Sequence, residues 1–400
     1  MRFLHTSDWH LGRTLHGVDL LDAQREVLGQ LCALVAEPPD GVAIDAVLVA
    51  GDIYDRAVPP VEAVTLFAGV LAELTRHTTV IVTAGNHDSA IRLGFGAELF
   101  TERLRVRTDL TGIGLPVMLP DPDGPVAVYP LPYLDPDAAR TVLSSTDQPL
   151  GRSHQAVTAA AMDRVRADLA SRGPGTRSVV MAHAFVVGGV PSESERPIVV
   201  GGVDSVAAGT FDGVDYVALG HLHGAQQPHG ASPDRAAGAT VLNYSGSPLR
   251  YSFSELGHTK SVTLVDLSPG APVRVSTVAL RQPREMAELT GPLDELLADT
   301  AHREHWVRIV VTDRSRPDQL FDRVKSRFPH VLQVLHLPAG AQPAGEALPI
   351  PQQASPRQLG ADFLRHVTGL DAVEAELRLF ELAYERAGAD PRSDSVAERR

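Results

Sequence analysis

The chain has 400 residues, of which 44% are hydrophobic and 21% are charged, so its composition is that of an ordinary globular protein. This length accommodates about two or three compact domains and excludes a short binding module. With 36 basic and 49 acidic residues, the formal net charge is −13. An acidic chain repels a phosphate backbone, so any nucleic-acid contact must be local, metal-assisted or supplied by a partner.

The single cysteine, Cys32, excludes a disulfide framework and a cysteine-rich zinc site within one subunit. This cysteine content favours a reducing cytoplasm. The first residues become polar too soon for a signal peptide, and no apolar run approaches the roughly 20 residues that span a bilayer. We therefore expect a cytoplasmic protein without a membrane span.

Short β-branched apolar runs that end in polar clusters predict strands buried on both faces. Apolar residues at helical spacing over 20–31 and 61–71 predict helices between the early runs. This alternation predicts an α/β layered domain, in which ligands bind at the carboxyl ends of the strands. The predicted strands cover 3–6, 46–50, 80–83, 178–182, 214–219 and 239–244.

Beyond about residue 275 the pattern changes to a β-α-β unit. A strand is predicted at 306–311, a helix at 317–328 with its proline in the first turn, and a second strand at 331–337. Proline-rich sequence then indicates a linker, and two amphipathic helices close the chain. The predicted organisation is a first domain over 1–275, a small α/β domain over 276–340, a linker over 341–356, the two helices over 357–388 and a disordered tail over 389–400.

The polar clusters at the strand ends offer carboxylates, imidazoles and a carboxamide, a set that suits Mn²⁺, Fe²⁺ or Zn²⁺. With one bridging carboxylate, these groups would fill two adjacent sites of the kind used for displacement at phosphorus. Residues two apart at a strand end point the same way, and a preceding glycine is expected to let the chain turn sharply. The candidates are Asp8, His10, Asp52, Asn86, His87, His183, His221 and His223.

Each piece alone has a simpler explanation. An Asp-x-His after a strand is more often turn chemistry, and an isolated histidine such as His183 is more often part of a core. The pieces nevertheless occur in order, and each follows a buried-strand pattern. That combination favours one shared metal site.

These motifs resemble the signature of the calcineurin-like metallophosphoesterases. The resemblance implies a layered β-sandwich core flanked by helices, a small α/β capping domain and C-terminal helices. The strings at 5–12 and 244–249 are more narrowly similar to SbcD-type nuclease subunits of bacterial SbcCD complexes. The motifs that carry the superfamily resemblance are Asp8-Trp9-His10, Gly51-Asp52, Gly85-Asn86-His87-Asp88, His183 and Gly220-His221-Leu222-His223.

The resemblance also implies a role for each candidate. It places Asp8, His10, Asp52 and His223 around one ion, and Asp52, Asn86, His183 and His221 around the other. His87 is the implied catalytic acid, which protonates the departing alkoxide after hydroxide held by the ions attacks phosphorus. The implied activity is Mn²⁺-dependent cleavage of DNA, exonucleolytic on duplexes and endonucleolytic on hairpins or single strands, in repair, recombination and replication.

The implied partners are DNA, an SbcC-type coiled-coil ATPase and a second copy of the chain, as a homodimer within a heterotetramer. Whether the C-terminal helices dock on a partner or on their own domain is left open. Two other functions also remain open. One is a phosphoesterase acting on cyclic nucleotides or other small phosphoesters, and the other is an adaptor without turnover, which the complete ligand set disfavours.

Overall fold

The computed structural model describes residues 1–144, 149–173, 175–196, 198, 205–228, 239–338, 356–368 and 370–388. The chain divides into two compact units, Met1–Arg284 and Glu285–Arg400. The first unit extends beyond the predicted boundary at residue 275, because strand β15 crosses that residue and pairs along its length with β14 of the same unit. Apart from Pro356, the predicted linker lies outside the described residues, as does the predicted tail over 389–400.

The first unit contains a six-stranded sheet in the order β15-β14-β1-β4-β5-β6. The neighbours from β1 to β6 are parallel, and β14 and β15 extend the sheet as antiparallel strands. The strands are β1 (Arg2–Thr6), β4 (Ala46–Ala50), β5 (Thr79–Thr83), β6 (Leu104–Arg107), β14 (Ser261–Asp266) and β15 (Arg274–Ala279).

A second sheet of five strands has the order β13-β12-β9-β8-β7, and only its edge strand β7 is antiparallel. All six strands that the sequence predicts for the first domain are present, divided equally between the two sheets. The strands of the second sheet are β7 (Val117–Leu119), β8 (Val126–Pro130), β9 (Arg177–His183), β12 (Tyr216–Gly220) and β13 (Val241–Tyr244).

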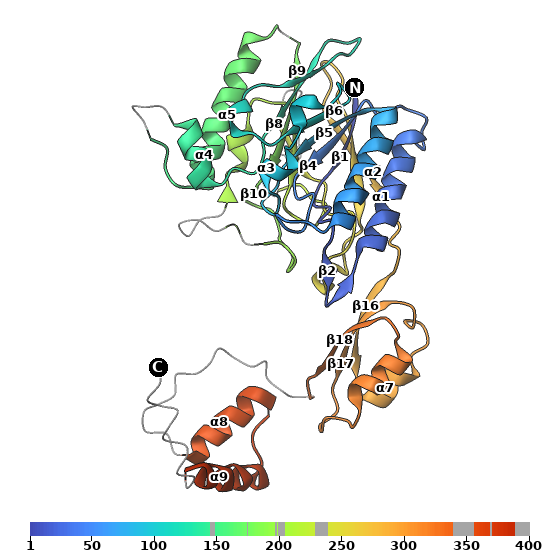
Figure 1. The fold of residues 1–400 in the computed structure, drawn as a ribbon, viewed down its shortest axis with the longest axis vertical. Helices are drawn as coiled ribbons and strands as arrows, with labels where there is room; N and C mark the ends of the chain where they lie inside the picture. Colours follow the sequence, from blue (N-terminus) through green and yellow to red (C-terminus); the bar gives the residue numbers. More distant parts are fainter. Residues whose placement is uncertain are drawn as a thin grey trace. The chain divides into compact units, whose positions relative to one another are not determined.

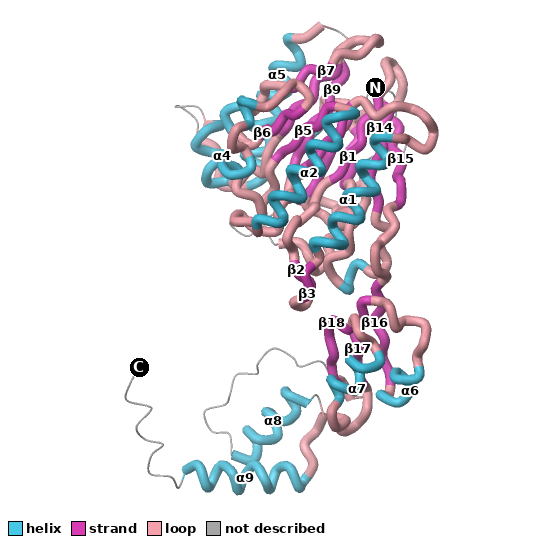
Figure 2. The backbone as a smooth tube through the Cα atoms, turned by 45° about the vertical axis from the view of Figure 1, so that its right-hand side comes forward, coloured by secondary structure: helices cyan, strands magenta, loops and turns pink. Residues whose placement is uncertain are grey.

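The central strands are apolar throughout because each of their faces meets a core. In β4, Leu48 packs in the core between the two sheets, whereas Val47 and Val49 pack toward the helices. Helices α1 (Leu21–Ala36) and α2 (Val61–His77) cover one side of the strands, and α4 (Pro136–Leu143) and α5 (His154–Ser171) cover the other (Figure 1). Figure 2 shows α1 and α2 lying across the sheet that contains β1 and β5.

These four layers confirm the predicted β-sandwich core flanked by helices. Short elements occupy the loops between the layers. They are β2 (Thr14–Leu15), β3 (Val18–Asp19), α3 (Ala90–Leu93), β10 (Phe185–Val186) and β11 (Ser205–Val206).

The second unit begins with a parallel three-stranded sheet, β16 (Met286–Gly291), β17 (Trp306–Val311) and β18 (Val331–His336). The predicted β-α-β unit is confirmed, and β16 and α6 (Leu293–Ala298) precede it. Helix α7 (Leu320–Arg327) starts after the predicted Pro317, because the preceding residue, Gln319, is left-handed with φ 51° and interrupts helical geometry.

Helices α8 (Pro356–Thr368) and α9 (Glu374–Gly388) form the predicted terminal pair and pack on each other. A Cβ added at Gly360 would lie 2.5 Å from the Phe380 ring, so the two helices approach closely there. Arg357 joins them through its ion pairs with Glu374 and Glu381. Within the described part of the chain, no helix is both long and apolar enough to cross a membrane.

Candidate metal centre

The candidate residues come from the carboxyl ends of five strands, three in the first sheet and two in the second. The loop after β1 carries Asp8 and His10, and its backbone is tied to the loop after β4. The Asp8 amide donates to the Gly51 carbonyl at 3.1 Å, and the His10 amide donates to the Asp52 carbonyl at 3.0 Å. In the second sheet, Gly220 pairs directly with His183, so His221 leaves β12 beside His183.

Left-handed backbone orients four of the candidates. Asp8, His10, Asp52 and His221 have φ values of 55°, 43°, 50° and 104°, respectively. Such conformations cost about 1–3 kcal/mol each and concentrate at functional sites. Asp8 and His10 do face one cluster of ligand atoms, but strand alternation is not the cause, because both lie beyond the end of β1 in non-extended backbone.

The glycines beside the ligands have two different roles. Gly51 has a φ of 85° and makes the expected sharp turn. Gly85 and Gly220 have no such φ, and their missing side chains instead allow close approach. A Cβ at Gly85 would lie 2.1 Å from Asp52 Oδ1, and one at Gly220 would lie 2.0 Å from the Ala50 carbonyl oxygen.

Replacing Gly220 with alanine is expected to lower the free energy of unfolding by about 3 kcal/mol or more, because the added Cβ meets backbone that cannot move aside. The matched control is Gly69→Ala on the exposed side of α2, where nothing lies within 4 Å. That change is expected to raise the free energy of unfolding by about 0.5–1 kcal/mol. Chemical denaturation of both variants checks the opposite signs, and equal stabilities would contradict the close approach.

One group of side chains gathers on the β1 side of the site. The Nε2 atoms of His10 and His223 are 3.0 Å apart, and Asp8 completes a cluster whose ligand atoms lie within 4.8 Å of one another. All three side chains are buried. Facing imidazole nitrogens and a carboxylate make a donor set that suits a borderline divalent cation.

A second group gathers around His183. Its Nε2 lies 2.9 Å from Asn86 Oδ1 and 3.4 Å from Asp52 Oδ2, and His221 Nδ1 lies 3.2 Å from the same Asn86 oxygen. Asp52 Oδ2 is also 3.6 Å from His10 Nε2. One carboxylate oxygen therefore faces both groups, which is the position that a bridging ligand requires.

The oxygen acceptors around His183 Nε2 favour a positive charge at that position. The His183 Nδ1–H donates to the Ala50 carbonyl at 2.9 Å, so Nε2 faces two oxygen acceptors. Burial opposes charge on the ring, but the carboxylates of Asp52 and Asp8 raise the pKa of His183 to about 9. Without a metal, a proton on Nε2 occupies the place of a cation, so the residues fit a divalent ion whose binding releases that proton.

Burial shifts the pKa values of the remaining carboxyl and imidazole groups in opposite directions, because it disfavours the charged form of each. It raises the pKa of Asp8 to about 6, and it lowers the pKa of His221 to about 3 and that of His10 well below its usual value. The histidines are thus kept neutral, which is the form that binds metals. Burial also acts to raise the pKa of Asp52, but the charge and hydrogen bond of His183 hold it well below its usual range.

His87 lies beside the ligand groups with a different set of contacts. Its ring packs edge-on against His10 at a centroid distance of 4.7 Å, and its Nδ1–H donates to the Asp55 carbonyl at 2.7 Å. Its Nε2 is buried and has no hydrogen-bond partner among the described residues. This nitrogen is therefore available for a proton that leaves or enters the site.

Sequence reasoning missed several residues that hold these groups in place. Asp88 accepts the backbone amides of Ile53, Tyr54 and Gly85, and so fastens the β4 loop to the β5 loop. Its position in the Gly-Asn-His-Asp string was the available signal. Asp55, three residues after Asp52, lies with its carboxylate 3.7 Å from His10 Nδ1.

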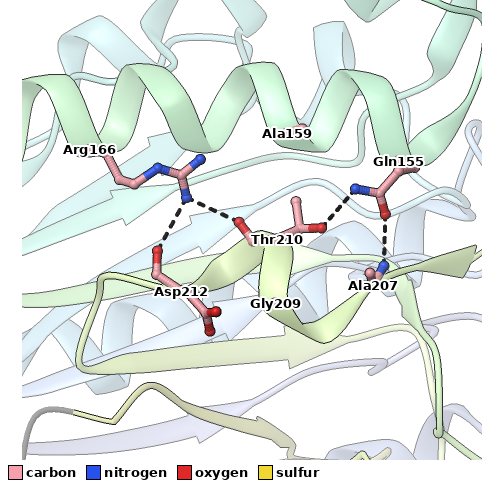
Figure 3. A pocket seen from close by; sticks show the side chains of 7 residues that line it. All are labelled: Gln155, Ala159, Arg166, Ala207, Gly209, Thr210 and Asp212. Atoms are coloured by element: carbon pink, nitrogen blue, oxygen red, sulfur yellow. Dashed lines mark hydrogen bonds between the residues drawn. The ribbon is translucent and has the colours of Figure 1, made fainter.

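One surface cavity lies away from this site. It has a volume of about 550 Å³ and lies between α5 and the 3₁₀ helix Ala208–Phe211 (Figure 3). Gln155 of α5 hydrogen-bonds to the Thr210 hydroxyl and to the Ala207 amide across the cavity. Arg166 of α5 donates to the backbone carbonyls of Thr210 and Asp212. None of the eight candidate residues lines this cavity.

A four-layer sandwich with carboxylates, imidazoles and a carboxamide converging at its strand ends has the features of a metal-dependent phosphoester hydrolase. The comparison with protein families agrees. Residues 1–225, more than half of the chain, match the family described as calcineurin-like phosphoesterase, and the chain belongs to that family. Its members use divalent metals, and the Asp and His clusters are the candidate metal-binding groups here.

Residues 282–368 match a second family, designated SbcD_C and described as the type 5 capsule protein repressor C-terminal domain. Together the two matches support an SbcD-type metallophosphoesterase. Among solved structures, the NAD nucleotidase of Haemophilus influenzae matches with 16% identity and a TM-score of 0.37. The match covers 89% of this chain and 64% of that one, and likeness at this level carries no functional conclusion.

Proposed function

We propose that this protein is a DNA nuclease that hydrolyses phosphodiesters at a site for two divalent ions, with Mn²⁺ as the physiological metal. The observation that supports it most directly is Asp52, whose Oδ2 faces His10 at 3.6 Å and His183 at 3.4 Å. The SbcD-type C-terminal domain favours DNA as the substrate. Repair, recombination and replication of DNA are the proposed cellular context, in the cytoplasm.

Each candidate has one proposed role at this site. Two divalent ions, when bound, would supply Lewis-acid stabilisation of charge on the phosphate oxygens and an activated water. Asp8, His10, Asp52 and His223 would hold one ion, and Asp52, Asn86, His183 and His221 would hold the other. His87 is the general acid, because the Asp55 carbonyl orients its ring while Nε2 remains free to protonate the departing oxygen.

Substrate class is tested by comparing turnover on three substrates in Mn²⁺: hairpin DNA, a cyclic nucleotide and a small chromogenic diester. We expect the specificity constant to be highest for DNA, because the match of residues 282–368 to the SbcD_C family favours a DNA substrate. The same preparation with EDTA serves as the blank. A higher specificity constant for the cyclic nucleotide would overturn the nuclease assignment and favour a phosphodiesterase of small substrates.

The C-terminal domain implies association with an SbcC-type partner. We infer that α8 and α9 dock on the coiled-coil region of that ATPase, since they present apolar side chains to solvent. Phe363, Leu379 and Leu382 are 56%, 70% and 52% exposed. Co-purification with the ATPase, with and without residues 355–400, tests this inference, and undiminished binding by the truncated chain would contradict it.

We also infer that the chain forms a homodimer through the segment that follows the Gly-Asn-His-Asp string. Ile91, Phe95 and Leu99 are 88%, 85% and 87% exposed, an unusual density of apolar surface beside the site. Phe95→Asp is expected to convert the dimer to a monomer by light scattering, because it places a charge on the apolar surface. The control is Val42→Asp, at a half-exposed valine outside this segment, and monomerisation by both variants or neither would contradict the interface.

A further inference from the structure

His223 is held by a set of polar residues that its metal-ligand role alone does not require. Its backbone amide donates to Glu195 Oε1 at 2.7 Å, and its carbonyl accepts from Lys260 Nζ at 2.9 Å. Its ring Nδ1 is 2.6 Å from Ser194 Oγ. Contacts at the amide, the carbonyl and the ring therefore fix this residue from two separate loops.

A buried ion pair lies behind these contacts. Lys260 Nζ is 2.5 Å from Glu255 Oε2, and the two side chains are 1% and 0% exposed. Lys260 also donates to Ser247 Oγ at 2.9 Å. A buried ion pair adds little to stability, because desolvation offsets the attraction between the charges. Its position directly behind a metal-ligand candidate suggests a different use.

The direction of the hydrogen bonds fixes the tautomer of His223. The Ser194 hydroxyl has one proton, and it donates that proton to Glu255 Oε1, which as a carboxylate only accepts. Ser194 must then accept the proton of His223 Nδ1. His223 Nε2 is left with its lone pair, and it is the atom that faces His10 Nε2 at 3.0 Å.

The two groups of ligands are thus supported differently. His183 donates its second ring proton to a main-chain carbonyl, that of Ala50. His223 Nδ1 instead donates to the Ser194 hydroxyl at 2.6 Å, which in turn donates to the buried Glu255 carboxylate, and the Glu255 Oε1 atom itself lies farther from Nδ1, at 3.4 Å. A carboxylate behind a metal-binding imidazole orients the ring and increases its basicity, and losing such a partner typically weakens metal binding.

We propose that Ser194 and Glu255, with Lys260 as the counter-ion, are positioning residues that fix His223 with Nε2 toward the metal centre and so set the affinity of the ion held by Asp8, His10 and His223. This inference rests on the proposed two-ion site. None of the three residues belongs to a recognisable motif, and two loops far apart in the sequence, around 191–196 and 253–260, bring them together.

The principal test is Ser194→Ala, which keeps the Glu255–Lys260 pair and removes only the bridging hydroxyl. Calorimetric titration of the metal-free protein with Mn²⁺ is expected to show roughly 10- to 100-fold weaker binding of one ion and unchanged binding of the other. Ser194→Thr, which keeps the hydroxyl, is expected to restore wild-type affinity. The matched control is Ser178→Ala, at another buried serine bonded to a carboxylate, Asp215 at 2.9 Å, at the opposite end of β9 from His183.

A second measurement does not depend on metal. Histidine-selective ¹⁵N NMR of the metal-free protein is expected to show His223 as the Nδ1–H tautomer in the wild type and in Ser178→Ala, and as a mixture in Ser194→Ala. An unchanged tautomer in Ser194→Ala, or equal weakening of both ions, would overturn the positioning role. A wild type that binds no Mn²⁺ but shows the expected tautomer change would instead refute the proposed metal site and leave the relay established.

Glu255→Gln tests the charge of the relay. It leaves the serine bond but removes the negative charge behind it, and the same single ion is expected to bind more weakly. Because this change also unpairs a buried lysine, Asp121→Asn is the control. Asp121 is likewise a buried carboxylate, paired with Arg177 at 2.9 Å, so its loss lowers stability without touching His223. Weaker Mn²⁺ binding by Asp121→Asn to the same degree would mean that general destabilisation, and not the relay, explains the effect.

Discussion

Asp52→Ala is expected to abolish the binding of both ions and with it phosphodiester hydrolysis. Asp52 Oδ2 faces His10 and His183 at 3.6 and 3.4 Å, and its Oδ1 accepts the His87 amide at 2.9 Å, so one truncation affects both ion sites and the loop of the general acid. Losing the several kcal/mol of charge stabilisation that bound ions provide corresponds to about a 10³-fold or greater fall in turnover.

Calorimetry with Mn²⁺ and turnover of a chromogenic diester measure the two effects of Asp52→Ala separately. Asp215→Asn is the matched control, because Asp215 is a carboxylate that bonds Ser178 at the other end of β9 and has no contact with the site. Two-ion binding by the Asp52 variant at wild-type affinity would show that the carboxylate is not a shared ligand, even if hydrolysis were lost.

His87→Ala is expected to retain both ions and to lose DNA cleavage by about 10²–10⁴-fold, the range typical for removal of a general acid. His87 touches the ligand groups only through its ring contact with His10, and its backbone amide bond to Asp52 survives the truncation. The predicted loss therefore concerns proton transfer and not the assembly of the metal centre.

The leaving group distinguishes this role from a purely structural one. A nitrophenolate departs without a proton, whereas the alkoxide of DNA needs one, so His87→Ala should reduce chromogenic diester turnover far less than DNA cleavage. His77→Ala, at the exposed end of α2, is the control histidine. Equal losses on both substrates would contradict the general-acid assignment and indicate that His87 acts on a step common to them.

The fold of the first unit could be predicted largely from its central strands. Because β4 and its parallel neighbours are covered on both faces, their apolar runs are continuous and easily recognised in the sequence. In contrast, only Met286 of β16 is fully buried, and that strand was not predicted. The first unit also extends beyond the expected boundary near residue 275, because β15 is a half-exposed edge strand whose assignment depends on pairing with β14.

The candidate site also contains some residues that the sequence predicts and others that it does not. All eight predicted residues lie at strand ends, where polar groups interrupt apolar runs and are therefore visible in the sequence. The sequence does not predict Asp55, Ser194 and Glu255, because none of them belongs to a motif. Their roles arise from contacts in the folded chain, of Asp55 with His10 and of Ser194 with His223 and Glu255. Asp88 lies within a recognised string, but it joins two loops only through contacts that form in the folded chain.

The amino-acid order by itself determined where the central buried strands form, which groups lie at their ends and that those groups suit divalent ions, since local periodicity and residue chemistry are properties of neighbouring residues. Packing of the two sheets alone decided that Asp52 faces both ligand groups. It also decided that left-handed backbone points Asp8 and His221 inward and that a buried Glu255–Lys260 pair stands behind His223. These relations join residues far apart in the chain, and their geometry arises only when the layers close on one another.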